Sequence, residues 1–175
     1  MSQRLSAVLD PDSIDVISHS PQQTIRIGQR IGSLLKAGDR VLLFGTFGAG
    51  KTHISKGFAA AFGVDQSLVT SPTFVIVNEY EGDAAHQRMR INHIDLYRLE
   101  SGAADFESIG LDELWDDEAI CIIEWAERML DALPPEYLAI RFDYLSETKR
   151  LMRITPRGPR YQQLVSLLRQ TAFAG

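Results

Sequence analysis

The sequence is poor in the residues that build disulfide frameworks and metal clusters. Of its 175 residues only one is a cysteine, Cys121, and the four histidines show no paired metal-ligand spacing. A single cysteine excludes an intrachain disulfide and a thiolate metal cluster. The chain also lacks any apolar run near the ~20 residues that a membrane-spanning helix requires, and its first residues contain no apolar core of signal-peptide length. We therefore expect a cytoplasmic protein without a membrane partner.

Positive charge is also scarce. The 18 lysine and arginine residues are outnumbered by 23 aspartate and glutamate residues, which gives a formal net charge of -5 at pH 7. An acidic surface provides no general electrostatic attraction to nucleic acid or to anionic membranes. If the protein acts in a nucleic-acid pathway, we expect it to do so through partner proteins.

The chain does contain enough apolar residues to build a core. Hydrophobic residues make up 45% of the chain and charged residues 23%, both ordinary for a folded domain. This composition excludes disorder of the whole chain, and the length fits one domain. We predict an N-terminal leader over residues 1–13 and a single domain over residues 14–175.

Hydrophobic patterning predicts alternating strands and helices. Residues 14–18 alternate as a short strand, and Ser20 followed by Pro21 is a helix start, with a hydroxyl N-cap and a proline in the first turn. Residues 41–44, VLLF, form a continuous apolar run typical of a buried parallel strand. The other elements are predicted as a helix over residues 54–62, strands over 73–80, 88–97, 119–125, 137–144 and 150–155, a turn over 81–87, short acidic helical pieces over 102–118 and a last helix over 159–172. This order favours one α/β domain with a mainly parallel sheet, flanking helices and a β-hairpin excursion.

The segment from Gly45 to Thr52 carries recognisable chemistry, because it reads GTFGAGKT. It fits the phosphate-binding pattern of a glycine-rich loop that ends in Gly-Lys-Thr. Glycines let backbone N–H groups turn toward a phosphate without a Cβ in the way. Lys51 would bind the β- and γ-phosphates, Thr52 would bind Mg²⁺, and the following helix would direct its positive end at the anion.

A magnesium–nucleotide site also needs a second anionic ligand, usually at the end of a neighbouring buried strand. Glu124 closes the apolar run AICIIE and is the obvious choice. Asp95, in the segment HIDLYR, is the next acidic residue that follows a β-rich stretch. Either carboxylate could instead be an ordinary residue at a strand boundary.

The phosphate loop alone leaves the class of nucleotide protein open. The pattern Asn-Lys-x-Asp for guanine and the pattern Asp-x-x-Gly of the usual GTPases are both absent, which disfavours guanine. Small-molecule kinases also begin with a phosphate loop and usually add an arginine-bearing lid. Four arginines near the C-terminus could form such a lid, although they more often decorate a strand and a helix: Arg150, Arg153, Arg157 and Arg160.

Four segments together resemble the TsaE (YjeE) family, a small bacterial ATPase required for threonylcarbamoyladenosine modification of tRNA. They are GTFGAGKT, TSPTFVIVNEY at residues 70–80, HIDLYRL at residues 93–99 and AICIIEW at residues 119–125. The resemblance covers residues 20–155, with matching order and spacing, and implies a P-loop NTPase fold.

The resemblance implies roles for individual residues. Mg²⁺ would be bound by Thr52 and Glu124, and catalysis would involve Lys51, Asp95 and Glu124, with Asp95 organising the attacking water. The residues implied in nucleotide binding are Ser20, Thr24, Gly48, Ala49, Gly50, Lys51, Thr52, His53 and Arg150.

Some of these implied roles are less direct. The segment from Ser20 to Thr24 falls where the family places adenine contacts, and Arg150 aligns with a basic residue near the nucleotide. Residues 70–73 match a switch-like stretch. Trp125 matches a family tryptophan beside the acid, although its ring could equally be a core aromatic.

The resemblance further implies Mg²⁺-dependent ATP hydrolysis, with the TsaB and TsaD subunits of the threonylcarbamoyl-transfer complex as partners. No arginine finger is evident, so we expect weak activity alone, stimulation within the complex and indirect contact with tRNA. Two alternatives remain open, namely a nucleotide-gated assembly module with incidental hydrolysis and a small-molecule kinase. A direct tRNA contact through Arg88, Arg90 and Arg98 is also open.

Replacing the loop lysine tests the phosphate-loop assignment. We expect Lys51→Ala to weaken ATP binding strongly, because it removes the one side-chain cation of the loop. Equilibrium titration with a fluorescent ATP analogue measures the effect. An unchanged dissociation constant would refute the assignment.

Overall fold

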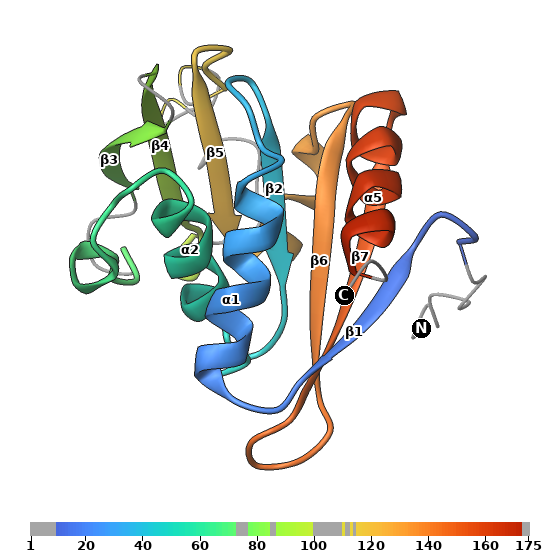
Figure 1. The fold of residues 1–175 in the computed structure, drawn as a ribbon. Coiled ribbons are helices and arrows are strands. Elements are labelled where there is room, and N and C mark those ends of the chain that lie inside the picture. Colours follow the sequence, from blue (N-terminus) through green and yellow to red (C-terminus); the bar gives the residue numbers. More distant parts are fainter. Residues whose placement is uncertain are drawn as a thin grey trace.

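The computed structural model describes residues 10–72, 77–84, 87–99, 110, 113 and 115–172. Seven strands form one sheet in the order β1-β7-β6-β2-β5-β4-β3 (Figure 1). The strands are β1 Ile14–Ser18, β2 Arg40–Phe44, β3 Val77–Ala84, β4 Gln87–Asp95, β5 Ala119–Glu124, β6 Tyr137–Tyr144 and β7 Arg150–Arg157. The helices are α1 Pro21–Gly32, α2 Lys51–Ala60 and α5 Pro159–Ala172, with the 3₁₀ segments η1 Gln66–Leu68 and η2 Ala126–Ala132.

The centre of the sheet is parallel. β2 pairs with β5 and with β6, and β4 pairs with β5. Antiparallel pairs complete the sheet on both sides, β3 with β4, β7 with β6 and β1 with β7. Almost every residue of β2 and β5 is buried, as expected for strands that are covered on both faces. The predicted α/β domain with a parallel sheet centre and flanking helices is confirmed.

The predicted β-hairpin is present, but the turn predicted over residues 81–87 is wrong at both ends, because β3 extends to Ala84 and β4 begins at Gln87. β3 continues through Ala84 and pairs antiparallel with β4 along that length. The backbone N–H of Asp83 donates to the carbonyl oxygen of Phe62 at 2.7 Å, and an added Cβ on Gly82 would collide with the same oxygen. These long-range contacts keep a segment of turn-like composition extended.

The other predicted strands, and the helices that begin near Ser20, Ile54 and Pro159, are confirmed with shifts only at their ends. The helical prediction over residues 102–118 is wrong at its end, because residues 115–118 form an irregular segment and a turn that lead into β5. The short segment η2 was not predicted. Most of the predicted leader, the first part of the strand over residues 73–80 and most of the acidic pieces over 102–118 lie outside the described residues.

The start of α1 follows its sequence signals. The Ser20 hydroxyl oxygen accepts a hydrogen bond from the backbone N–H of Gln23 at 3.2 Å, and Pro21 occupies the first turn, where no N–H is needed. Behind this cap the hydroxyls of Ser18 and Thr24 are hydrogen-bonded at 2.7 Å. The bond ties the end of β1 to the first turn of α1.

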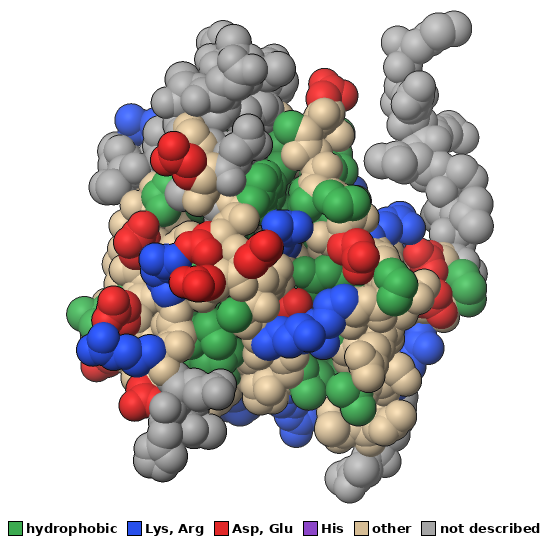
Figure 2. All heavy atoms as spheres, turned by 90° about the horizontal axis from the view of Figure 1, so that it is seen from above, with side chains coloured by type: hydrophobic (Ala, Val, Ile, Leu, Met, Phe, Trp, Pro, Cys, Tyr) green, Lys and Arg blue, Asp and Glu red, His purple; other side chains and the backbone are tan. Residues whose placement is uncertain are grey.

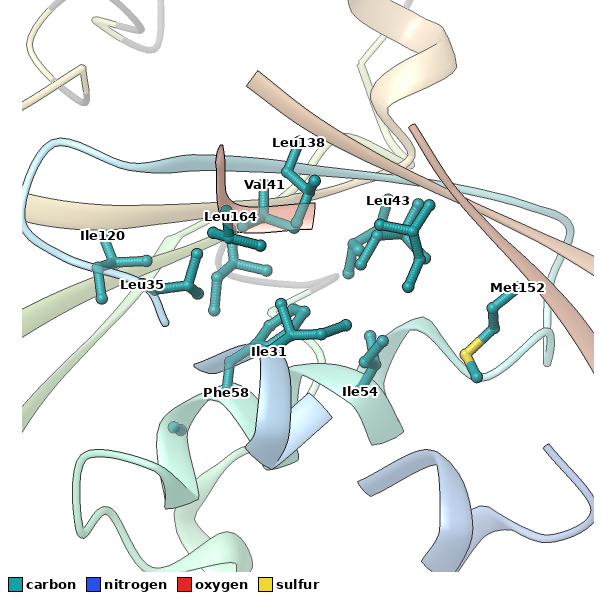
Figure 3. Close-up of a cluster of buried hydrophobic side chains, with 14 of the residues drawn as sticks. Ile31, Leu35, Val41, Leu43, Ile54, Phe58, Ile120, Leu138, Met152 and Leu164 are labelled. Atoms are coloured by element: carbon teal, nitrogen blue, oxygen red, sulfur yellow. The ribbon is translucent and has the colours of Figure 1, made fainter. Parts of the chain in front are cut away.

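α1, α2 and α5 cover one face of the sheet, and their apolar side chains form the larger core (Figures 1 and 3). None of the described helices is long and apolar enough to cross a membrane. The cluster in Figure 3 includes Ile31 and Leu35 near α1, Val41 and Leu43 of β2, Ile54 and Phe58 of α2, and Ile120, Leu138, Met152 and Leu164 from β5, β6, β7 and α5.

A smaller apolar cluster lies on the other face, where alternate residues of the same strands meet η2. Leu42 and Ile123 point there, whereas their neighbours Val41 and Ile122 belong to the larger core. Met129 of η2 is fully buried in this second cluster. The central strands are therefore covered on both sides, which explains their unbroken apolar runs.

The face at the amino ends of the parallel strands carries mixed charge. Figure 2 looks onto this face and shows Lys and Arg side chains interspersed with Asp and Glu side chains. The ion pairs near these strand ends are Arg40–Asp117, Arg90–Asp116 and Arg160–Asp39. Arg90, one of the three arginines considered for direct tRNA contact, is therefore neutralised by a carboxylate.

α1 and α2 cross at close range because glycines face each other. A Cβ on Gly28 would collide with the carbonyl oxygen of Ile54, and a Cβ on Gly57 would collide with the carbonyl oxygen of Ile25. The contact is therefore one of backbone on backbone. It determines how closely α2, and with it the loop that precedes α2, lies against α1.

Substituting Gly57 tests this contact. We expect Gly57→Ala to lower the free energy of unfolding by about 1–3 kcal/mol, because overpacking outweighs the gain in helix propensity. Lys56→Ala, one residue away, is the matched control and should stay within about 0.5 kcal/mol of wild type. Urea unfolding measures both. A Gly57→Ala protein more stable than wild type would contradict the close crossing.

Candidate functional site

The site lies where three neighbouring parallel strands end. β2 ends at Phe44 and leads into the glycine-rich loop, β5 ends at Glu124, and β4 ends at Asp95. The carboxyl ends of parallel strands share one edge of a sheet, which is where open α/β sheets bind ligands. A pocket of about 540 Å³ opens here. Its lining residues are Phe47, Gly48, Ala49, Gly50, Lys51, Thr52, His53, Ser71, Asp95, Tyr97, Arg98, Glu124 and Trp125.

The backbone of the loop takes a form that requires glycine. Gly48 and Gly50 have φ angles of 72° and 110°, which side chains with a Cβ rarely adopt. α2 begins directly after Gly50, at Lys51. The first N–H groups of α2 have no partner within the helix and point toward the loop, an arrangement suited to an anion such as phosphate.

The side chain of Lys51 is held over the glycine-rich loop by carbonyl groups of that loop. Its Nζ donates to the carbonyl oxygens of Gly45 at 2.6 Å and Thr46 at 2.8 Å, and it lies 4.0 Å from the centre of the Trp125 ring. Burial lowers the pKa of Lys51, and the negative charges of Glu124 and two other nearby carboxylates oppose that shift. The result is a positioned cation inside the pocket.

Thr52 and Glu124 bring oxygen ligands together. The Thr52 hydroxyl donates to the Glu124 carboxylate and lies 3.2 Å from Oε1 and 3.3 Å from Oε2. Mg²⁺ prefers oxygen ligands in an octahedron with bonds of about 2.0–2.1 Å, which places neighbouring ligand oxygens about 3 Å apart. Both the donor set and its spacing fit a magnesium ion.

Asp95 lies beside Glu124, because the two residues are partners in the parallel register of β4 and β5. It is 2% exposed. Its Oδ2 accepts a hydrogen bond from the Ser71 hydroxyl, and its Oδ1 accepts one from the backbone N–H of Tyr97, both at 2.8 Å. The described part of the switch-like stretch over residues 70–73 therefore touches the predicted catalytic acid.

Trp125 follows Glu124 in an unusual backbone conformation. Its φ of 59° and ψ of 41° are left-handed, which is rare for a bulky residue and costs about 1–3 kcal/mol. The ring stacks at a tilt on Tyr97, with 4.9 Å between ring centres. This turn places the indole in the wall of the pocket, between the Lys51 ammonium and the smaller apolar cluster.

Comparison with known proteins agrees with this geometry. A family model described as threonylcarbamoyl adenosine biosynthesis protein TsaE matches residues 18–152 of the chain. The chain belongs to the TsaE family. Its resemblance to that family, inferred above from four sequence segments, is thereby confirmed.

Individual TsaE proteins are similar to this chain over most of their length. The tRNA threonylcarbamoyladenosine biosynthesis protein TsaE of Bacillus subtilis is 35% identical over 83% of this chain and 87% of its own length. The TsaE proteins of Treponema pallidum and Aquifex aeolicus are each 39% identical, over 77% and 80% of this chain and 94% of their own lengths. The crystal structure of Bacillus subtilis YdiB matches with a TM-score of 0.76 and 30% identity, over 91% of this chain and 96% of that chain.

Ser20 and Thr24, which the family resemblance places near adenine, do not line the described pocket. Ser20 caps α1, and Thr24 is buried against Ser18. The methyl group of Thr24 lies 4.0 Å from the position that a Cβ on Gly50 would occupy. Thr24 therefore lies against the back of the glycine-rich loop of this TsaE protein, and contact of either residue with adenine stays a prediction.

Arg150 braces the tip of the loop. Its guanidinium donates to three carbonyl oxygens of the β6–β7 turn and approaches the carbonyl oxygen of Gly48 at 3.5 Å. It also stacks on Tyr144 at 3.9 Å, whose hydroxyl donates to the carbonyl oxygen of Phe47 at 3.0 Å. Direct contact of Arg150 with a nucleotide stays a prediction.

His53 lines the pocket from the first turn of α2. Burial lowers the pKa of its imidazole, and the positive charges of Lys56 and Arg150 lower it further, against the opposing charge of Glu124. The lowered pKa favours the neutral form of the imidazole, which can both donate and accept a hydrogen bond. Its predicted contact with a nucleotide remains to be tested.

Sequence reasoning missed four residues around the pocket. Phe47, Tyr97 and Arg98 line it, and His93 lies 2.8 Å from Glu124. The signal for His93 was present, because it precedes Asp95 by two residues on a strand, and such residues share a face. Phe47, which is 80% exposed, and Arg98 follow ends of strands, where sequence alone does not show which way a side chain turns.

The Thr52 hydroxyl is open to a clean test. We expect Thr52→Val, which is nearly isosteric, to remove the part of nucleotide affinity that depends on Mg²⁺. Thr52→Ser should retain that part, because it keeps the hydroxyl. Nucleotide titrations with Mg²⁺ and with EDTA measure the difference. Equal metal effects in the two variants would exclude Thr52 as a ligand.

Proposed function

We propose that this chain is a Mg²⁺-dependent ATPase that acts in threonylcarbamoyladenosine modification of tRNA in the cytoplasm. The observation that supports this most is the convergence of Lys51, Thr52 and Glu124 in one pocket, at the start of a helix preceded by glycines. A cation suits the phosphates of a nucleoside triphosphate, and a hydroxyl beside a carboxylate suits the metal ion that accompanies them. The relatives named for threonylcarbamoyladenosine biosynthesis supply the pathway.

In this proposal each residue has a separate task. The loop N–H groups and Lys51 bind the phosphates and balance the charge that develops on them. Thr52 and Glu124 hold Mg²⁺, which when bound neutralises phosphate charge. The Asp95 carboxylate is positioned by Ser71 and by the backbone of Tyr97, and it lines the pocket, where it would orient the attacking water.

The proposed partners are the TsaB and TsaD subunits of the threonylcarbamoyl-transfer complex, with tRNA contacted indirectly. Among the described residues, two arginines lie close to the pocket. Arg98 lines it, and Arg150 is engaged with carbonyl groups of the β6–β7 turn. We expect slow hydrolysis by the chain alone, since an arginine supplied by a partner raises turnover by about 10³–10⁵-fold in related phosphate-loop enzymes.

Phosphate release from ATP and Mg²⁺ tests the proposal, measured for the chain alone and with both partner subunits. We expect a low rate alone, marked stimulation by the partners, and loss of stimulation in Glu124→Ala. Glu118→Ala is the matched control, because this exposed carboxylate precedes β5 at the end away from the pocket.

Other results would select an alternative. Tight ATP binding without stimulated hydrolysis, together with tRNA modification that persists in Glu124→Ala, would favour a nucleotide-gated module. Transfer of phosphate to an acceptor metabolite instead of release as free phosphate would favour a small-molecule kinase.

A further inference from the structure

Glu124 has a buried partner on the neighbouring strand, His93. His93 lies on β4, one strand away, and its Nε2 is 2.8 Å from Oε1 of Glu124. The His93 side chain is 0% exposed and that of Glu124 3% exposed. A hydrogen bond between two groups so fully removed from water is strong and geometrically demanding.

The direction of this hydrogen bond follows from the chemistry of its partners. An ionised carboxylate only accepts hydrogen bonds, so the nitrogen that contacts it must carry the hydrogen. His93 therefore donates from Nε2, whether its ring is neutral or charged. Its Nδ1 is buried and has no hydrogen-bond partner among the residues that the structure describes.

Glu124 is consequently held from the side of the protein interior. Oε1 accepts the hydrogen bond from His93 Nε2 and lies 3.5 Å from the hydroxyl of the buried residue Ser55. The hydroxyl of Thr52, the other proposed metal ligand, lies 3.2 Å from Oε1 and 3.3 Å from Oε2. Both carboxylate oxygens therefore lie near Thr52, and among the described residues His93 and Ser55 contact the carboxylate through Oε1.

We propose that His93 is a positioning residue for the metal site, and that its Nε2–H holds the Glu124 carboxylate so that Oε2 and the Thr52 hydroxyl together face the cation. This inference rests on the proposed function, since it assumes that Glu124 binds Mg²⁺. Hydrogen bonds from outer residues to a ligating carboxylate orient it and contribute to metal affinity.

A role in packing alone does not account for this side chain. The ring of Tyr80 lies at a tilt to that of His93, with 6.1 Å between ring centres, and this contact requires a ring but no ring nitrogen. An aliphatic residue would fill the position without burying an unpaired Nδ1, which costs free energy. The polar contact that His93 gains in return is the one with Glu124.

The test measures how much Mg²⁺ strengthens nucleotide binding, independently of turnover. A non-hydrolysable ATP analogue is titrated with excess Mg²⁺ and with EDTA, and the ratio of the two dissociation constants is the metal effect. Binding of Mn²⁺ to the analogue complex, followed by electron paramagnetic resonance, provides a second readout. We expect His93→Leu to weaken the bound metal by about 10- to 100-fold, with unchanged binding in EDTA.

Matched variants separate positioning from packing. His93→Gln places an amide N–H near the position of Nε2 and should restore the metal effect, whereas the shorter His93→Asn should not. If His93→Leu does not fold, the Gln and Asn pair carries the test. Ile91→Val, on the same strand and in the core beneath α2, should lower thermal stability without changing the metal effect.

Different outcomes would refute the role of His93 and the magnesium site on which that role depends. If His93→Leu and His93→Asn show the same metal effect as the wild type, the positioning role of His93 is refuted and the magnesium site stands. An equal loss in His93→Gln and Ile91→Val would also refute the positioning role, because the effect would then come from packing. A wild-type protein that binds the analogue with no metal effect would overturn the magnesium site together with the inference.

Discussion

Parallel pairing of β5 with β2 on one side and with β4 on the other is the constraint on which the whole site depends. This pairing aligns the carboxyl ends of three strands, so that the glycine-rich loop, Glu124 and Asp95 reach the same edge although they are far apart in the chain. In register, Glu124 lies opposite Leu43 on one strand and Asp95 on the other. A shift of the register by one residue would turn every side chain of β5 to the opposite face and remove the carboxylate from the pocket.

The buried polar groups around Glu124 are stable in the interior only because they are hydrogen-bonded to one another. An ionised carboxylate that is buried without partners costs several kcal/mol. Three donors compensate for the burial of Glu124, namely Thr52, Ser55 and His93. The positive charge of Lys51 also lies nearby, and the charge of Glu124 in turn acts to raise the pKa of Lys51. Removing one member would leave the others buried without a hydrogen-bond partner, which destabilises a folded protein.

The position of the loop depends equally on the contact between α1 and α2. The loop ends where α2 begins, and the backbone of α2 approaches α1 at Gly28 and Gly57 without intervening side chains. On the other side of the loop, Tyr144 and Arg150 hold its tip through carbonyl oxygens. The glycine-rich loop is therefore fixed at its base by helix packing and at its tip by the β6–β7 turn.

The sequence by itself determined the elements and the chemistry of the loop. Apolar runs without polar interruption specify buried parallel strands, hydroxyl and proline residues specify the start of α1, and Gly48 and Gly50 are needed wherever backbone N–H groups must converge on an anion. These signals are local, since each depends on neighbours within a few residues. For the same reason the identities of Lys51, Thr52 and Glu124 as candidate site residues could be predicted without coordinates.

Only the tertiary structure decided which of these residues meet, and at what distance. The pairing of β3 with β4 overrode the turn-like composition of residues 81–84, and the strand order placed His93 beneath Glu124. The same folding turned Ser20 and Thr24 away from the lining of the pocket and set Arg150 against the loop carbonyls. Some of these contacts join residues tens of positions apart, such as His93 with Glu124 and Arg150 with Gly48, and their geometry follows from register, crossing distance and burial, which no local pattern of residues encodes.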